Sequence, residues 1–184
     1  MPSAFNQRDS VQGHQATRSV RNGEIAVGPE TQRLIESGVE PRWGQFLRTW
    51  EALAAAKGRY PSRTEIDPSE LGAKLLPNVF LVDVVTGEGA KAPRFRFRLL
   101  GQAIVDREPT RPGDYLDEIG ATAELAIIAQ HYRDCMAGKV SVRASSLSWR
   151  SERSGCLLYE AMMLPLTDDG ETVTHLIGLA LYEF

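Results

Sequence analysis

The sequence predicts an α+β fold built on an antiparallel sheet of consecutive hairpins. In the segment 94–101, charged and apolar residues alternate strictly from 94 to 99, which is the pattern of a strand with one buried face and one solvated face. Two apolar runs, 156–166 and 174–182, are joined by a segment that contains Asp-Gly, a dipeptide typical of tight hairpin turns. Apolar residues also recur at helical spacing in 43–54 and in 121–137, so helices accompany the sheet.

Length and composition predict one soluble domain. The 184 residues are 42% hydrophobic, which is enough for a single core. The formal net charge of −3 offers no general attraction to nucleic acid or to an anionic membrane, so neither is expected as a partner. The chain has two cysteines, no signal-peptide pattern and no apolar run of about 18 residues, so we expect a cytoplasmic protein with reduced thiols.

The first 58 residues divide into a tail and a helical segment. Residues 1–29 carry few apolar side chains and are expected to form a flexible tail. Residues 30–58 form the helical segment, with a short helix over 31–37 and a longer amphipathic helix that has Pro41 in its first turn and Gly58 at its end. The apolar side of the longer helix, called the aromatic stripe below, consists of Trp43, Phe46, Leu47 and Trp50.

The remaining elements belong to one domain, residues 59–184. Asp67 caps a short helix that starts at Pro68, and β-branched residues predict a first strand over 78–85. The second strand is 94–101, and prolines limit the segment after it to short helical turns. The later elements are a longer helix over 121–137 and three strands over 140–150, 156–166 and 174–182.

This order of helix, two strands, short helices, longer helix and three strands is that of a PAS domain. Five short segments, including Phe-Arg-Phe-Arg-Leu-Leu-Gly, carry a closer likeness: 61–68, 75–77, 95–101, 113–117 and 164–166. Through them the chain resembles a family of small stand-alone bacterial PAS-like proteins, from which it departs at 107–112, where the family has a glycine-containing approach to its central helices. The resemblance implies a five-stranded antiparallel sheet with helices on one face, a cavity between them, and a sensory or regulatory role without catalysis.

The cavity implied by the resemblance lies between the inner face of the sheet and the helices of 102–137. Alternation along the second strand and helical spacing beyond it predict an apolar lining of Phe95, Phe97, Leu99, Ile104, Leu125, Ile128 and Tyr132. Tyr115 is expected near the mouth, and either Tyr132 or Glu160 is expected to orient a ligand. Such a lining suits a small, mostly apolar ligand, but the same residues also describe a filled core.

Three arginines, Arg94, Arg96 and Arg98, stand about 7 Å apart on the charged face of the second strand. In one interpretation, acidic neighbours neutralise them on a solvated face. In the other, they bind a nucleotide or another anion. Glu160 also has two interpretations, because it could pair with Arg96 or Arg143 across strands instead of contacting a ligand.

The sequence assigns no cofactor and no metal. His131 and Cys135 lie one helical turn apart, but the other cysteine and histidine residues are distant and no Cys-x-x-Cys motif is present, so both are interpreted as core residues. No Gly-x-Ser-x-Gly motif is present, which favours a protein that is not an enzyme. The alternative is a small enzyme that uses Glu160 or Asp114 with His131 on an apolar, ester-like substrate.

The last predicted strand is apolar on both faces, so both faces of the sheet need cover. The helices of 102–137 cover one face, and the aromatic stripe, a second subunit, or both cover the other. We therefore predict a homodimer in which the aromatic stripe contacts the partner subunit. The predicted function is that of a non-enzymatic sensory or regulatory module in signal transduction, which binds a small ligand, contacts an unidentified signalling protein, or does both.

Overall fold

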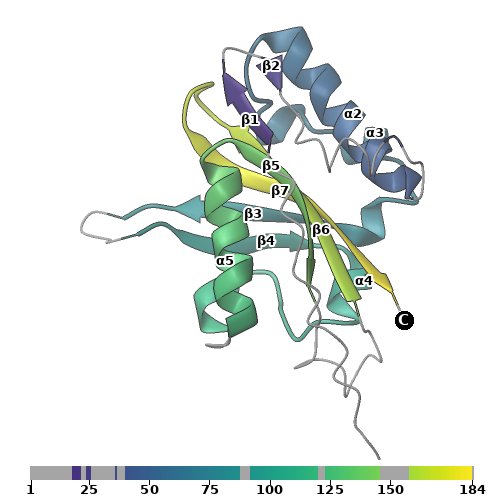
Figure 1. Cartoon of the computed structure of the whole chain (residues 1–184), viewed down its shortest axis with the longest axis vertical. Helices are drawn as coiled ribbons and strands as arrows, with labels where there is room; N and C mark the ends of the chain where they lie inside the picture. Colours follow the sequence, from purple (N-terminus) through teal and green to yellow (C-terminus); the bar gives the residue numbers. More distant parts are fainter. Residues whose placement is uncertain are drawn as a thin grey trace, which may run out of the picture.

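An antiparallel sheet organises the computed structural model, which describes residues 18–21, 24–25, 36, 40–87, 92–119, 123–145 and 158–183 (Figure 1). Its strands lie in the order β2-β1-β5-β6-β7-β3-β4. Their bounds are β1 Arg18–Arg21, β2 Glu24–Ile25, β3 Val79–Val85, β4 Arg94–Leu100, β5 Lys139–Ser145, β6 Leu158–Thr167 and β7 Val173–Glu183. The predicted α+β class and the antiparallel pairing of strands are confirmed.

The sheet is wider than predicted. The sequence predicts five strands and a structureless tail over 1–29, whereas seven strands are present in the described part of the chain because β1 and β2 extend the sheet. β1 pairs with β5 through Arg18 opposite Val140, and an edge strand offers such a segment a row of unpaired backbone groups. The rest of 1–29, and all of the helix predicted over 31–37 except Glu36, lie outside the described residues.

The long N-terminal helix is α2, Pro41–Lys57. The side chain of Glu40 accepts a hydrogen bond from the Arg42 backbone N–H at its start, and Gly58 takes a left-handed φ of 63° at its end. The shorter elements are η1 Arg63–Glu65, α3 Pro68–Leu71, η2 Leu76–Asn78, α4 Gln102–Val105 and η3 Leu116–Glu118. The second long helix is α5, Ala123–Met136, and no helix among the described residues is long and apolar enough to cross a membrane.

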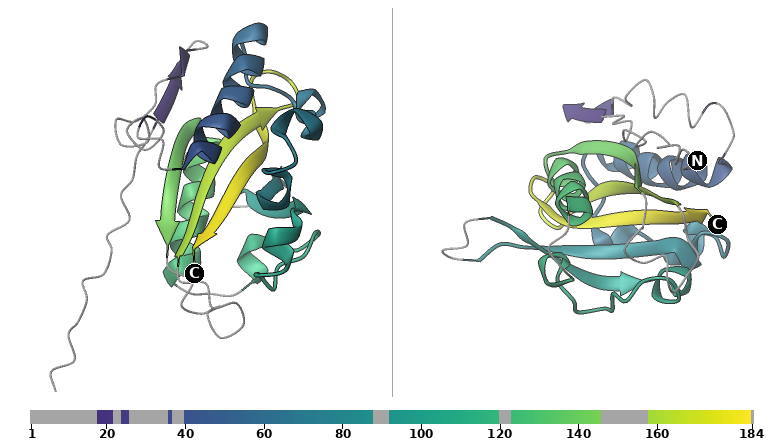
Figure 2. Two further views of the ribbon diagram at one scale, coloured as in Figure 1. Left: turned by 90° about the vertical axis from the view of Figure 1, so that its right-hand side faces the viewer. Right: turned by 60° about the horizontal axis from the view of Figure 1, so that its bottom comes forward.

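Helices lie on both faces of the sheet (Figure 2), and each face has its own hydrophobic core. α2 packs on the outer face, and its side chains share a cluster with Leu164, Ile177 and Leu179. α5, α4 and η3 pack on the inner face, where Leu176 and Ala180 belong to the second cluster. β7 therefore buries alternate residues in two different cores, which explains why its sequence is apolar on both faces.

The aromatic stripe lies inside the protomer. Its four side chains are only 1–3% exposed in the single chain. The indole Nε1 of Trp50 donates a hydrogen bond of 3.0 Å to the backbone oxygen of Pro165 in β6. The prediction that these four residues contact a partner subunit is therefore corrected, because the outer face of their own sheet already buries them.

A β-bulge breaks the alternation on which the predicted cavity depends. Leu81 of β3 pairs with Leu99 of β4, but the next residue, Val82, pairs with Phe97, so Arg98 is an extra residue in β4. After the bulge Leu100 faces the inner core and Leu99 does not. The predicted inward orientation of Leu99 is therefore wrong, and its side chain is 47% exposed.

Candidate functional site

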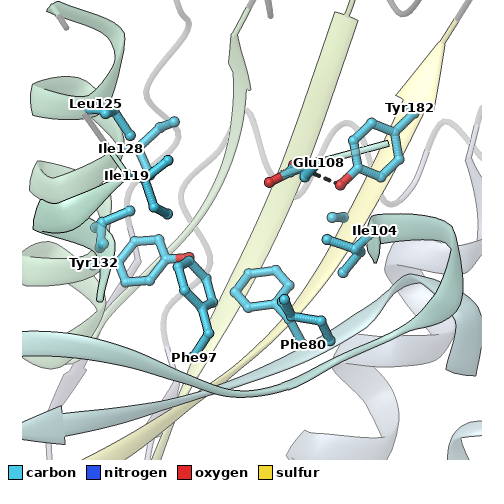
Figure 3. Close-up of a pocket in the computed structure, with 12 residues that line it drawn as sticks. Phe80, Phe97, Ile104, Glu108, Ile119, Leu125, Ile128, Tyr132 and Tyr182 are labelled. Carbon is cyan, nitrogen blue, oxygen red and sulfur yellow. Dashed lines mark hydrogen bonds between the residues drawn. The ribbon is translucent and has the colours of Figure 1, made fainter. Parts of the chain in front are cut away.

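A small pocket lies on the inner face of the sheet, under α4, η3 and α5 (Figure 3). Its cavity volume is about 30 Å³. That is room for roughly two water molecules, whereas pockets that enclose small-molecule ligands have about 300–1,000 Å³. The lining is Phe80, Phe97, Leu100, Ile104, Glu108, Leu116, Ile119, Leu125, Ile128, Tyr132, Ala180 and Tyr182.

Aromatic rings form the sheet side of this pocket. The ring of Phe80 lies directly on the backbone of Gly178, so close that a Cβ built there would be 2.1 Å from the Phe80 Cζ atom. Tyr132 reaches in from α5 and has its ring centroid 5.2 Å from that of Phe95 and 6.3 Å from that of Phe97. These contacts fix the floor of the pocket, since close-packed rings leave one another little freedom to move.

One hydrogen-bonded pair stands out in the apolar lining. The hydroxyl of Tyr182 at the end of β7 donates to the Glu108 carboxylate, which follows α4, over 2.8 Å. The guanidinium of Arg107 lies 5.4 Å from the centroid of the Tyr182 ring. In Figure 3 this pair lies across the pocket from Leu125 and Ile128, so the cavity has an apolar wall on one side and a carboxylate on the other.

The η3 segment covers the pocket and is tied to β4 through Arg94. This guanidinium donates to Asp117 over 2.8 Å and to Glu118 over 2.6 Å, and it lies 3.9 Å above the ring centroid of Tyr115. The pKa of Arg94 is raised by these carboxylates, with Asp117 the larger cause. The ion pairs are exposed, so they contribute little to stability.

The other two arginines of β4 meet a buried carboxylate on the outer face. Asp83 of β3 accepts hydrogen bonds from Arg96 over 2.7 Å and from Arg98 over 2.6 Å, and the Nε2 atom of His175 lies 3.4 Å from its Oδ1 atom. Burial alone would raise the pKa of Asp83, but the hydrogen bonds from Arg98 and Arg96 outweigh it and keep that pKa below its ordinary value.

Each arginine of the predicted row therefore has an acidic partner within the chain. These pairings are the kind that the first of the two interpretations expects, with the difference that Arg96 and Arg98 share the single carboxylate of Asp83. Arg96 is not a cross-strand neighbour of Glu160, because β7 and β3 lie between β6 and β4. Arg143, the other partner that the alternative for Glu160 offers, is on β5, which pairs with β6.

Five of the nine predicted ligand-binding residues line the pocket: Phe97, Ile104, Leu125, Ile128 and Tyr132. Phe95 belongs to the inner core but not to the lining, and Tyr115 lies under Arg94. The prediction that Glu160 lies in this pocket is corrected. Glu160 is on the same face of β6 as Met162 and Leu164 of the outer core, so it lies on the face away from the pocket.

The sequence did not predict the other seven residues of the pocket lining, which are Phe80, Leu100, Glu108, Leu116, Ile119, Ala180 and Tyr182. Alternation shows that Ala180 and Tyr182 share one face of the last predicted strand, and it assigns Phe80 to one face of the first. It does not show which of these faces is turned toward the pocket. Glu108 has no pattern of its own in a proline-containing loop. Its role depends on Tyr182, which lies 74 positions further along the chain.

His131 and Cys135 are buried on α5, and their burial fits the interpretation as core residues. Burial raises the pKa of the Cys135 thiol, which keeps it protonated and unreactive near neutral pH. Within the described residues, no group of three or more His, Cys, Asp or Glu side chains is placed to hold a metal ion.

Comparison with known proteins supplies a family. A family model described as PAS domain matches residues 40–181, a range that starts just before α2 and includes nearly all of β7. No curated protein and no solved structure matches the chain.

Proposed function

The chain belongs to the PAS domain family, whose members are in general non-enzymatic sensory modules, and we propose that it senses a small molecule in the pocket of the inner face. The observation that carries this proposal is the apolar cavity with one carboxylate, Glu108, held by Tyr182. Pockets for small ligands combine such a lining with a few polar groups that fix orientation.

The pocket chemistry points to a ligand with an apolar body and a hydrogen-bond donor. A carboxylate accepts several hydrogen bonds, so a hydroxyl or amine of the ligand can bind Glu108 beside the Tyr182 hydroxyl or in its place. The apolar body then faces Leu125 and Ile128 across the cavity (Figure 3).

Such a ligand requires the pocket to widen, because about 30 Å³ admits only water-sized molecules. Packed aromatic rings fix the sheet side, whereas η3 is held to β4 partly by the exposed ion pairs of Arg94. Exposed ion pairs are weak, so the site opens by displacement of η3 and not by movement of the packed rings. The signal is then a changed surface at η3 and α5, which a partner protein recognises.

The test combines native mass spectrometry of the purified protein with extraction of bound small molecules and thermal melting against a panel of alkyl alcohols and amines. We expect a ligand of this class to bind the wild type and to raise its melting temperature. Leu125→Trp places an indole in the cavity and abolishes binding, whereas Ile127→Trp makes the same change on the exposed side of α5 and leaves it intact.

The second candidate is a protein-interaction module whose pocket is only a packing gap. The volume of about 30 Å³ favours it. In that case no small molecule is recovered, no panel member shifts the melting temperature, and Leu125→Trp destabilises by about 1–3 kcal/mol through overpacking. A homodimer remains a prediction in either case, and its contact has to lie elsewhere than the aromatic stripe.

A further inference from the structure

Near the end of β4, two neighbouring side chains are both exposed, Arg98 and Leu99. The Arg98 side chain is 44% exposed and Leu99 is 47% exposed. In a regular strand, consecutive side chains point to opposite faces, so one of the two would be buried against the inner core. The bulge at Arg98 removes that constraint, and bulges are features that re-aim side chains at sheet edges.

Arg98 is held in place by one nitrogen. Its Nε atom donates to Oδ1 of the buried Asp83 over 2.6 Å, while the Nε and Nη2 atoms of Arg96 donate to Oδ2 of the same carboxylate. The two guanidinium groups share one carboxylate and so retain one positive charge in excess. A guanidinium anchored through Nε can still donate from its Nη groups to an incoming carboxylate.

Leu99 lies at the molecular surface beside the outer core. It is paired across the ladder with Leu81, which is half-buried and packs against the outer core. β4 is the last strand of the sheet, so this end of the outer face lies at the sheet edge (Figure 1). A partner side chain placed on Leu99 would remove apolar surface from water next to a core that is already packed.

We propose that Arg98 and Leu99 form a docking surface for a segment of a partner protein that carries an apolar side chain beside a carboxylate. The carboxylate pairs with the anchored guanidinium, and the apolar side chain covers Leu99. Arginine at such a contact gives geometric specificity, and a desolvated apolar anchor gives affinity. This surface lies on the face opposite the pocket, so the proposal does not depend on a ligand there.

The test is a selection of random linear peptides, displayed on phage, against the full-length chain. We expect the enriched peptides to carry Asp or Glu next to Leu, Ile or Phe. Binding of these synthetic peptides, measured by fluorescence anisotropy, is expected to weaken about tenfold or more in Leu99→Ser and in Arg98→Gln. It is also expected to weaken as salt rises, because exposed charge pairs are screened.

Two matched variants control for general changes of the surface. Ile127→Ser removes an apolar side chain of similar exposure, 49%, from α5, and Arg48→Gln removes an exposed arginine from α2. Both are expected to bind the selected peptides as the wild type does. Arg98→Gln removes a hydrogen bond to the buried Asp83 and so could also affect folding, which thermal melting monitors. Leu99→Ser leaves the hydrogen bonds to Asp83 in place, so a loss of peptide binding in this variant reports on docking alone.

The proposal is wrong if no peptides are enriched, if the enriched peptides lack acidic residues, or if they bind Leu99→Ser as tightly as the wild type. It is also wrong if sedimentation shows a wild-type dimer that Leu99→Ser dissociates, because the occupant is then a second copy of this chain.

Discussion

Replacement of Trp50 tests whether the aromatic stripe stabilises the protomer or a subunit contact. The side chain is 1% exposed, its indole lies 6.0 Å from the Tyr60 ring, and its Nε1 atom bonds to the Pro165 oxygen over 3.0 Å. All of these contacts lie within one chain. Trp50→Ala is therefore expected to destabilise each protomer by about 3–5 kcal/mol.

The hydrogen bond can be separated from the packing. Trp50→Phe keeps an aromatic ring but leaves the buried Pro165 oxygen without its donor, which costs about 1–3 kcal/mol. In a chain of this length, 1 kcal/mol shifts the melting temperature by about 2–4 °C, so Trp50→Ala is expected to lower it by about 6–20 °C. Leu47→Met on the same helix serves as a volume-conserving apolar control without a lost hydrogen bond, and is expected to cost less than about 1.5 kcal/mol.

The assay is thermal and urea unfolding of each variant at several protein concentrations, with sedimentation to follow the oligomeric state. If Trp50 acts within the protomer, the loss of stability is the same at every concentration. A wild-type melting temperature for Trp50→Ala, together with a dimer that dissociates more easily, would show that the stripe contacts a partner subunit and would refute the reasoning.

Three further predictions concern the pocket and the outer face. Gly178→Ala is expected to cost about 1–3 kcal/mol because its Cβ would overlap the Phe80 ring; a double-mutant cycle with Phe80→Leu should recover part of that cost, and additive costs would contradict it. Ala180→Val partly fills the cavity of about 30 Å³ and is expected to stabilise the folded chain by up to about 0.7 kcal/mol, at about 24 cal/mol per Å³ of cavity. A clear loss of stability in urea unfolding would instead mean that the added methyl groups do not reach the cavity. Burial lowers the pKa of His175 in the folded state, so part of the stability that is present above the unfolded pKa of about 6.5 is lost as the pH falls toward the folded pKa. His175→Gln should reduce this loss in melting curves recorded between pH 7.5 and 5. An unchanged pH dependence in this variant would show that another group causes the loss.

Local patterns in the sequence determined where the long N-terminal helix begins and ends and where the last hairpin turns, but they did not predict β1 and β2. Pro41 and Gly58 predict the ends of the long helix, and α2 spans Pro41–Lys57. Asp-Gly predicts the hairpin between the last two strands, where Gly170 takes a φ of 90°. These predictions succeed because a cap or a turn depends on residues only a few positions apart.

The site was predictable only where periodicity holds. Helical spacing placed Leu125, Ile128 and Tyr132 in the pocket, because all three lie on one side of a regular helix. Strand alternation gave Phe97 correctly but failed two residues later at Leu99, since a bulge reverses every orientation after it.

Tertiary structure alone decided which side of the sheet each alternating set faces, and which distant residues meet. Period-two alternation shows that Glu160, Met162 and Leu164 share a face, but only packing against α2 makes it the face away from the pocket. The pairing of Glu108 with Tyr182, and of Asp83 with two arginines of the next strand, depends on strand order and register. No local propensity encodes strand order, because it results from the mutual burial of complete elements.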